Sequence, residues 1–424
     1  MQEYRPRIID DKLKQKLIVG AVLIKGPKWC GKTWTAEKQA KSLLLMDDPE
    51  KREQNVALAK NSPSLALEGE TPRLIDEWQL VPKLWDAIRF EVDKRNLPAQ
   101  FILTGSAVPV DMSEIDHSGT GRIAQLLMSP MSLFESGEST GDVSLEELFD
   151  TPEQISGTSN LGLKDLAFLA CRGGWPRTVG YTGQEALTLS ESYFDGLVEN
   201  DISRVDGVKR SPNIARKVLR SYARNQGQQA TFESIKKDTG ASDGLSVSID
   251  SIYDYVEAFR KLFVIEDLPA WNPNLRSKAA ARTTDTRYFV DPSIATQALG
   301  LSPEDLIRDL KTFGFIFETL CMRDLRVYAD SIRGQISHYR DSNGLECDAV
   351  IHSNDGRYGL IQIKLGSDDE TIEQAVEKLT ELTERIDDTK MNKPSFRMVL
   401  VGNAPNAYRR EDGVYVVPIG CLKN

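Results

Sequence analysis

The apolar positions in the first third of the chain fall into short runs, with helical spacing between them. The runs occupy residues 17–24, 42–46, 73–75, 101–103 and 123–128. Short apolar runs that alternate with amphipathic helices are typical of a parallel sheet with helices on both faces. We therefore predict an α/β domain over residues 1–135.

The middle of the chain, residues 161–275, carries apolar residues mostly at helical spacing. It contains the turn sequence GGWPR at 173–177, and its three candidate helices lie at 214–225, 231–239 and 246–262. An apolar stretch at 263–271 follows, which we expect to form a strand pair. Three helices and a hairpin describe a winged helix. Before this region, residues 136–160 are rich in Glu, Ser, Thr and Gly, which predicts a linker.

The last part, residues 276–424, returns to a mixed α/β pattern. We expect helices at 313–328 and 370–384 and strands at 336–339, 347–351 and 358–364. An acid on one of these strands and an amide and a lysine on the next resemble the layout of metal-dependent nucleases, so we expect a restriction-endonuclease-like α/β domain here.

Length and composition are those of a multidomain globular protein. At 424 residues the chain exceeds one usual core, and a net charge of -10 argues against coating nucleic acid or membrane with its whole surface. The five cysteines are scattered without C-x-x-C spacing and the three histidines form no ligand cluster, so we expect a reducing compartment and no zinc site. No apolar run approaches the roughly 18 residues that span a bilayer. We expect a cytoplasmic protein without a signal segment or a membrane contact.

The sequence GPKWCGKT at residues 26–33 follows the first apolar run and precedes a helical pattern. It has the form G-x-x-x-x-G-K-[ST] of a phosphate-binding loop. Gly26 and Gly31 let the loop turn sharply, so that backbone N–H groups close on phosphate oxygens. Lys32 then reaches the β- and γ-phosphates, and the Thr33 hydroxyl faces Mg²⁺. The predicted ATP contacts are Gly26, Pro27, Lys28, Trp29, Cys30, Gly31, Lys32, Thr33 and Trp34.

A short apolar strand at 73–75 ends at an acidic pair, Asp76 and Glu77. We predict that Asp76 holds Mg²⁺, directly or through water, and that Glu77 orients and deprotonates the attacking water. A solvated acidic pair at a strand end is the alternative. The phosphate loop upstream favours the functional interpretation.

The apolar run at 101–103 ends in small hydroxyl residues, and we expect this strand to lie between the first two. Thr104 or Ser106 would then face the γ-phosphate as a sensor, and the alternative is a plain strand end. Arg122 lies in the Gly-flanked segment 119–122, where a guanidinium can stabilise transition-state charge on closure or on assembly into a homo-oligomer. The alternative for Arg122 is an ordinary surface arginine.

A second candidate site lies in the last domain. Asp348 is on one expected strand, and Gln362 and Lys364 are two apart on the next, so they share a face. This layout resembles D-x(n)-(D/E)-x-K nucleases, in which carboxylates hold a metal ion and the lysine positions water. An amide is a weaker ligand than a carboxylate, for which Glu346 and Glu318 could compensate. An active nuclease and an inherited fold used for binding both stay open.

A local basic band interrupts the acidic chain between residues 204 and 224. Its members are Arg204, Lys209, Arg210, Arg216, Lys217, Arg220 and Arg224, against the single acid Asp206. Such a band can neutralise phosphates, so Arg216, Lys217 and Arg220 are candidate DNA contacts. A solvated helix face or a subunit contact is the alternative.

Several of these motifs together resemble a known family. GPKWCGKT, LIDEW, FILTGS and the Gly-Arg segment are similar to the AAA-type ATPases of bacteria and archaea whose C-terminal half is the domain of unknown function 4143. Their pattern is closer to GPRQVGKTTL, DEIQ and LTGS, followed by PLSFxE, where this chain has PMSLFE at 130–135. GGWPR, the segment 200–202 and YFVDP at 288–292 extend the resemblance over nearly the whole chain. It implies an ATPase core, a winged helix and a nuclease-like fold, with departures at Lys28, Trp29 and Gln362.

We thus expect an ATP-hydrolysing AAA-type protein with ATP and Mg²⁺ as ligands, acting with DNA or in a regulatory or defence switch. One alternative is an ATP-gated protein-interaction protein whose nuclease fold is degenerate. The other is an active metal-dependent DNA nuclease coupled to ATP.

Overall fold

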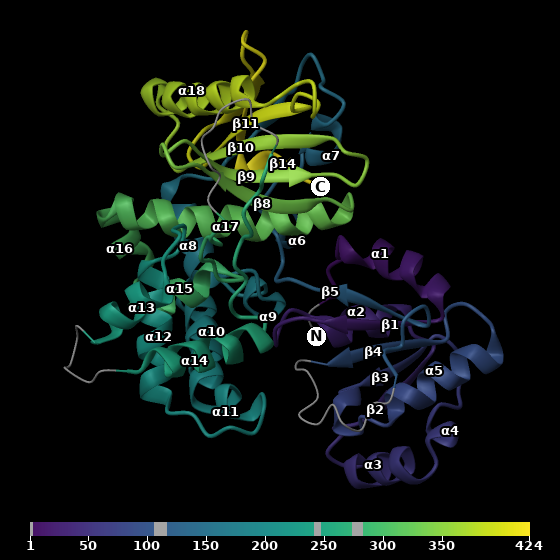
Figure 1. Ribbon diagram of the computed structural model, residues 1–424. Helices are drawn as coiled ribbons and strands as arrows, with labels where there is room; N and C mark the ends of the chain where they lie inside the picture. The colour runs from purple at the N-terminus through teal and green to yellow at the C-terminus, as the bar shows by residue number, and fades with distance from the viewer. Residues whose placement is uncertain (1–2, 106–116, 241–246, 274–282) are drawn as a thin grey trace.

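The computed structural model describes residues 3–105, 117–240, 247–273 and 283–424, which form three parts (Figure 1). The N-terminal part is built on a parallel sheet, the middle part is helical, and the C-terminal part contains a mixed sheet. The predicted α/β class, with a parallel sheet of the P-loop type followed by a helical region, is confirmed.

The N-terminal sheet has the strand order β2-β3-β4-β1-β5, and all its neighbouring strands are parallel. Its strands are β1 Ala21–Lys25, β2 Ser42–Leu45, β3 Arg73–Asp76, β4 Phe101–Gly105 and β5 Ile123–Leu127. The helices of this part are α1 Ile9–Lys16, α2 Lys32–Gln39, α3 Arg52–Asn61, α4 Pro63–Ala66 and α5 Leu84–Arg95. β4 lies between β1 and β3, as predicted. β1 begins later than predicted because Leu17–Val19 form a 3₁₀ turn that ends at Gly20, whose φ is 115°.

Each face of this sheet is buried against its own helices. Ala21 and Leu23 of β1 lie in one apolar cluster with Ile88 of α5. Val22 and Ile24 alternate with them and lie in a second cluster, which contains residues of α1 and α2. Because all five strands are parallel, their carboxyl ends meet at one edge of the sheet, and the segment after β1 begins there.

Residues 136–160 pack into the protein, so the predicted linker is wrong. They contain the end of α6 Leu133–Ser136, β6 Val143–Ser144, α7 Leu145–Leu148 and β7 Gly157–Thr158. β6 pairs with β14 Leu422–Lys423 near the end of the chain, and β7 pairs with β12 Asn406–Arg409. The polar composition is misleading because Val143, Leu145 and Leu148 are spaced among the acids and are all buried.

The middle part is helical, as predicted. Its helices are α8 Leu163–Arg172, α9 Pro176–Val179, α10 Gly183–Gly196, the π-helix η4 Leu197–Asp201, α11 Ile202–Arg204, α12 Pro212–Arg224, α13 Phe232–Gly240, α14 Ile249–Lys261, α15 Pro292–Leu299 and α16 Pro303–Arg308. Residues 263–271 do not pair with each other, so that hairpin prediction is wrong. Ile265 and Leu268 instead bridge to Phe289 and Thr286, which come later in the chain. The winged helix stays a prediction.

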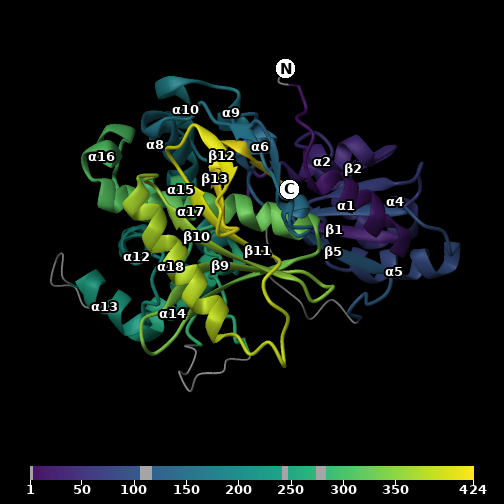
Figure 2. The same cartoon turned by 90° about the horizontal axis from the view of Figure 1, so that it is seen from above.

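The C-terminal sheet has the order β7-β12-β13-β11-β10-β9-β8. Its remaining strands are β8 Gln335–Arg340, β9 Glu346–His352, β10 Tyr358–Lys364, β11 Phe396–Val401 and β13 Tyr415–Pro418. α17 Leu310–Ser331 and α18 Asp369–Arg385 cover opposite faces of this sheet, and α18 crosses its strands obliquely (Figures 1 and 2). The helices and strands expected here are confirmed, while the nuclease-like fold itself stays a prediction.

Candidate nucleotide-binding site

The loop at residues 26–33 joins β1 to α2 at the carboxyl edge of the parallel sheet. Gly26 and Gly31 have φ values of 153° and 102°, which side chains rarely allow. A Cβ atom on Gly26 would lie 2.2 Å from the carbonyl oxygen of Met128. Trp29 also has a positive φ, of 66°. Both glycines are therefore required by the turn itself, as the motif predicts.

Lys32 begins α2, and its side chain bends back over the loop. Its Nζ donates to the carbonyl oxygens of Gly26 at 3.0 Å and Pro27 at 2.7 Å. An ammonium has three protons, and the third is directed at Cys30 Sγ, 4.0 Å away, a weak acceptor that a phosphate oxygen at the mouth of the loop can replace. Lys32 is buried, and because the surrounding dielectric constant is low, its charge attracts an anion more strongly than it would in water.

Asp76 ends β3 beside this loop and receives two hydroxyl groups on one carboxylate oxygen. Thr33 Oγ1 of α2 donates to Asp76 Oδ1 at 3.0 Å, and Thr104 of β4 donates to the same oxygen. Thr104 reaches it because Asp76 and Thr104 are register partners on adjacent parallel strands. Burial raises the pKa of Asp76, and the two hydroxyl groups oppose that shift. Hydroxyl and carboxylate oxygens form a donor set that fits Mg²⁺.

Glu77 follows Asp76 in a left-handed backbone conformation with φ 53°. Burial is the main cause that raises the pKa of Glu77, and the neighbouring Asp76 charge adds to it. Gln79 donates its Nε2 proton to Glu77 Oε2, which fixes the direction of the carboxylate. The sequence interpretation missed Gln79, for which a polar residue two positions after the acidic pair was the available signal.

The side chains at the tip of the loop contact the helical part of the chain. Lys28 Nζ forms an ion pair with Asp201 Oδ1 of η4 at 2.6 Å. The Trp29 ring lies 5.5 Å from the Tyr193 ring of α10, and the Arg177 guanidinium lies 5.2 Å from the Trp29 ring. A cavity of about 370 Å³ is lined by Lys28, Trp29, Tyr193 and Asp201 and reaches Arg204. These contacts join residues that are far apart in the sequence.

A second cavity, of about 290 Å³, lies beside the start of α2. Trp34 and Tyr4 line it, with their ring centroids 6.4 Å apart and their planes nearly perpendicular. Pro176 of α9 also lines it, together with Gly31 of the phosphate loop and Thr35 of α2. The cavity is therefore partly aromatic and adjoins the loop directly.

Arg122 lies away from this edge of the sheet. It immediately precedes β5, whose first residue pairs with Ala21 at the amino end of β1, whereas the phosphate loop follows the carboxyl end of β1. Its Nε donates to Asp93 Oδ1 of α5 at 2.7 Å. A role for Arg122 at its own phosphate loop is thus excluded by the sheet geometry, because the two ends of a strand are far apart. Ser106, the other predicted sensor, lies outside the described residues.

The second candidate site is brought together by α17, β9 and β10. Lys364 Nζ lies 3.2 Å from Gln362 Oε1 and 3.7 Å from Asp348 Oδ2, so its ammonium occupies the space between them. Glu318 binds the Tyr288 hydroxyl, and burial, followed by the Asp348 charge, raises the pKa of Glu318 to about 8. Asp348 also accepts the backbone N–H of Ile363 at 2.7 Å.

No group of three or more His, Cys, Asp or Glu side chains is placed to hold a metal ion in the described part of the chain. Glu318, Asp348, Gln362 and Lys364 do lie together, as predicted. They do not include three His, Cys, Asp or Glu side chains placed to hold a metal ion. The five cysteines are free and buried.

Three members of the basic band are paired with acids, and all of those acids except Asp206 lie outside the window of residues 204–224. Arg216 contacts Asp195 at 2.8 Å and Glu199 at 2.9 Å. Arg210 is buried between Asp206 and Asp254, and Arg224 pairs with Asp238. Lys217 and Arg220 lie on the same helix, and Arg220 is exposed. DNA contact by the basic band stays a prediction.

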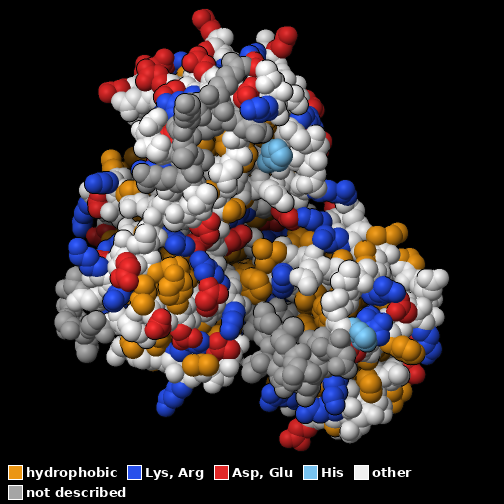
Figure 3. Space-filling view, in the orientation of Figure 1, with side chains coloured by type: hydrophobic (Ala, Val, Ile, Leu, Met, Phe, Trp, Pro, Cys, Tyr) orange, Lys and Arg blue, Asp and Glu red, His pale blue; other side chains and the backbone are white. Residues whose placement is uncertain are grey.

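In the C-terminal part, acidic side chains gather over α18 (Figure 3).

Within the described ranges, every helix is too short or too polar to span a bilayer.

The parallel sheet and the geometry of the loop, Asp76 and Glu77 are those of a P-loop domain. Comparison with known proteins agrees: an AAA domain matches residues 19–136, and the domain of unknown function DUF4143 matches residues 313–422. A third match, to the domain of unknown function DUF8612, covers residues 163–305. The resemblance to AAA-type ATPases with a C-terminal DUF4143 domain is thus confirmed.

Several related proteins have no described function. Uncharacterized proteins of Mycobacterium bovis and Mycobacterium tuberculosis are each 22% identical over 342 residues, which is 80% of this chain and 69% of the relative. An uncharacterized protein of Haemophilus influenzae is 24% identical over 57% of this chain and 56% of its own length. A solved structure, the Walker-type ATPase of Pyrococcus abyssi, is 16% identical, with a TM-score of 0.40 over 70% of this chain and 96% of that chain.

Proposed function

We propose that the protein binds ATP and hydrolyses it with Mg²⁺. The observation that supports this most directly is the convergence of Thr33 and Thr104 on the Asp76 carboxylate, at the mouth of a loop closed by Lys32. A solvated acidic pair would not be buried or receive hydroxyl groups from two other elements. Glu77 lies next to it, and its carboxylate is held by Gln79.

In this proposal, the loop N–H groups and Lys32 bind the β- and γ-phosphates and neutralise their charge. Thr33 and Asp76 would hold Mg²⁺, which supplies further charge neutralisation when it is bound. Glu77 orients a water molecule in line with the γ-phosphate and accepts its proton. A carboxylate with a raised pKa is a better base near neutral pH than an exposed one.

The cavity lined by Tyr4, Trp34 and Pro176 is the proposed place for the base of the nucleotide. It adjoins the start of α2, and its two aromatic rings offer the flat apolar contacts that a base takes.

Arg122 would act in the site of a second copy of the chain. Its position at the amino ends of the strands supports this, since it is too far from its own loop to act there and its side chain is 46% exposed. The protein is then a homo-oligomer, and the guanidinium of one copy stabilises transition-state charge in the next.

We favour a regulatory or partner-binding role over DNA cleavage. The contacts of Lys28 and Trp29 with Asp201 and Tyr193 connect the phosphate loop to the helical part, so nucleotide state can change the position of those helices. At the nuclease-like site, the Lys364 ammonium lies where a nuclease needs a metal ion. A nucleic-acid role is the second candidate, based on Lys217 and Arg220.

The test is phosphate release by the purified protein with ATP and Mg²⁺, with and without duplex and single-stranded DNA. Asp76→Asn is the control, because asparagine keeps an oxygen for the two hydroxyl groups but loses the charge. We expect Mg²⁺-dependent turnover by the natural sequence and little by the variant. Equal turnover by both would overturn the proposed site. Stimulation by DNA that is lost in Arg220→Glu would instead support the nucleic-acid role.

A further inference from the structure

A buried guanidinium lies directly behind the phosphate loop, on a segment that precedes the sheet. The Arg7 side chain is 3% exposed and uses all three nitrogens. Nη1 donates to the carbonyl oxygen of Cys30 at 2.7 Å, Nη2 donates to that of Ser129 at 2.8 Å, and Nε donates to Glu135 Oε1 at 2.9 Å. Burial of a charge is costly unless it is paired and hydrogen-bonded, and each contact here meets that need.

The contact with Cys30 fixes one peptide plane of the loop. In a trans peptide, the carbonyl oxygen of one residue and the N–H of the next point in opposite directions. The carbonyl of Cys30 points at Arg7, so the N–H of Gly31 points away from Arg7. Gly31 has φ 102° and precedes Lys32, and it supplies one of the backbone donors that such a loop uses for phosphate.

We propose that Arg7 is a positioning residue of the phosphate loop, which aims the Gly31 N–H at the phosphates by holding the Cys30 carbonyl. The inference rests on the proposed nucleotide binding. Arg7 does not itself touch the reacting atoms, since its nitrogens are all committed behind the loop. Lysine at this place keeps the charge but has no planar fork, so it cannot reproduce three divergent contacts.

Glu135 connects this arrangement to the C-terminal half. It accepts Arg7 through Oε1 and the backbone N–H of Ser132 through Oε2, at the start of α6. The next residue, Leu133, donates its N–H to Asp324 of α17 at 2.9 Å.

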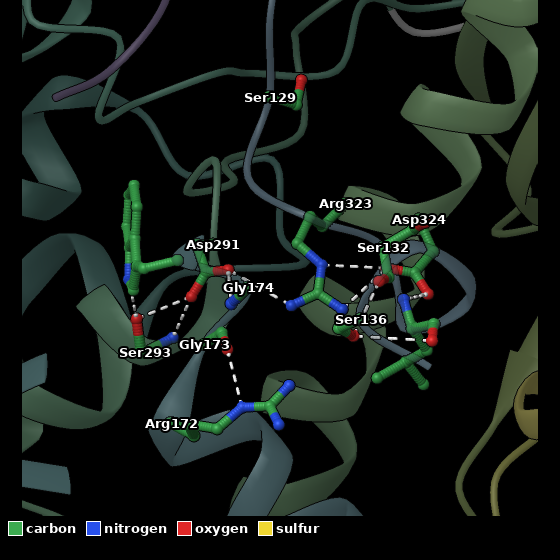
Figure 4. Close-up of polar contacts among 12 residues, drawn as sticks. Ser129, Ser132, Ser136, Arg172, Gly173, Gly174, Asp291, Ser293, Arg323 and Asp324 are labelled. Atoms are coloured by element: carbon green, nitrogen blue, oxygen red, sulfur yellow. Dashed lines mark hydrogen bonds and ion pairs between the residues drawn. The ribbon is translucent and has the colours of Figure 1, made fainter. Parts of the chain in front are cut away.

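Asp324 is part of a buried network that returns toward the phosphate loop. Its neighbour Arg323 binds both Asp324 and Asp291, and Asp291 accepts the N–H of Gly174 at 2.8 Å (Figure 4). Gly174 lies two residues before Pro176, whose ring is 3.3 Å from the place of a Cβ on Gly31. Arg7 is therefore connected through Glu135 and the start of α6 to buried residues of α17, which hold it in place.

The experiment compares Arg7→Lys with Arg287→Lys. Arg287 is a buried arginine in an ion pair with Asp267 at 2.6 Å, and its Nε donates to the carbonyl oxygen of Ala230 at 3.0 Å. Neither partner belongs to the phosphate loop or to the network around Asp291, so Arg287→Lys is a matched control. The measurements are the dissociation constants for fluorescent ADP and ATP analogues, the KM and kcat for ATP, and the thermal unfolding curve.

For Arg7→Lys we expect dissociation constants and KM to rise about tenfold, as loss of one charge-assisted hydrogen bond gives, with kcat changed less than about twofold. Arg287→Lys should bind as the natural protein does. Nucleotide affinity that is unchanged in folded Arg7→Lys would overturn the inference, as would a fall in kcat alone. Absence of binding by the natural protein would instead refute the proposed function.

Glu135→Gln provides the second variant if Arg7→Lys does not fold. It removes the counter-charge but leaves the bonds of Arg7 to Cys30 and Ser129, so we expect a loss of affinity of about threefold. The double variant should lose no more than Arg7→Lys alone, because both changes act on one contact. A loss in the double variant equal to the product of the single losses would contradict this coupling.

Discussion

Glu77→Gln should abolish turnover and leave nucleotide binding intact. The amide is the same size as the carboxylate and keeps an oxygen to accept the Gln79 proton, so the local structure should not change. It cannot accept a proton from water, and loss of a positioned general base costs about 10²- to 10⁴-fold in rate. We expect a fall in kcat within this range and a dissociation constant for ATP changed less than about twofold.

The pH dependence of ATP turnover tests the role of Glu77 independently. Burial raises the pKa of Glu77 above its ordinary value, and only the deprotonated form can act as a base. The natural protein should therefore gain activity as pH rises through that raised pKa and then reach a plateau. In Glu77→Gln this rise should disappear, because the group that titrates has been removed.

The assay is phosphate release under saturating ATP and Mg²⁺ from pH 5 to 9, with ATP binding measured in parallel. Glu68→Gln is the matched control, since it makes the same substitution at an exposed position of the same part of the chain. Retention of more than a tenth of the activity in Glu77→Gln would refute its role as the base. An unchanged pH profile in that variant would refute the link between the profile and Glu77.

Three further predictions follow from particular contacts. Inactive Arg122→Ala and Glu77→Gln proteins should regain phosphate release when mixed, because each supplies what the other lacks; no recovery at any ratio would argue against a shared site. Lys28→Asp should weaken the loop contact with Asp201, and the reverse change at Asp201 in the same chain should restore ATP turnover; a double variant no better than Lys28→Asp would count against this pair. The folded-state pKa of Glu318 is raised to about 8, so its proton is bound more tightly in the folded state, and stability should fall as pH rises from about 4.5 to 8. Urea titrations should show a smaller fall in Glu318→Gln, and an identical fall would contradict the assignment.

The elements around the nucleotide site were predictable because their signals are local. The loop GPKWCGKT, the acidic pair at the end of β3 and the apolar runs of the sheet each lie within a few residues, and the structure places them at one edge. The segment 136–160 was not predictable in the same way, because burial of Val143 depends on pairing with Leu422 near the other end of the chain.

The residues that support the site could not be predicted from a local sequence signal. Arg7 looks like one of many charged residues in the sequence, and only the fold brings it to Cys30 and Glu135. The basic band looks strongly positive in the sequence, but the fold pairs two of its arginines with Asp195, Glu199 and Asp254. These acids lie outside the window in which the charge of the band was counted.

The P-loop, the parallel sheet and the candidate catalytic residues Lys32, Thr33, Asp76 and Glu77 could all be predicted from the sequence alone. Those features follow from spacing along one strand, loop and helix, where neighbours in sequence are neighbours in space. Three features became visible only in the folded chain: Thr104 donates to the Asp76 carboxylate, Arg122 lies at the end of the strands away from its own loop, and Arg7 contacts the loop from behind. Each of these depends on contacts between distant segments, and such contacts are set by packing and strand order rather than by any local pattern.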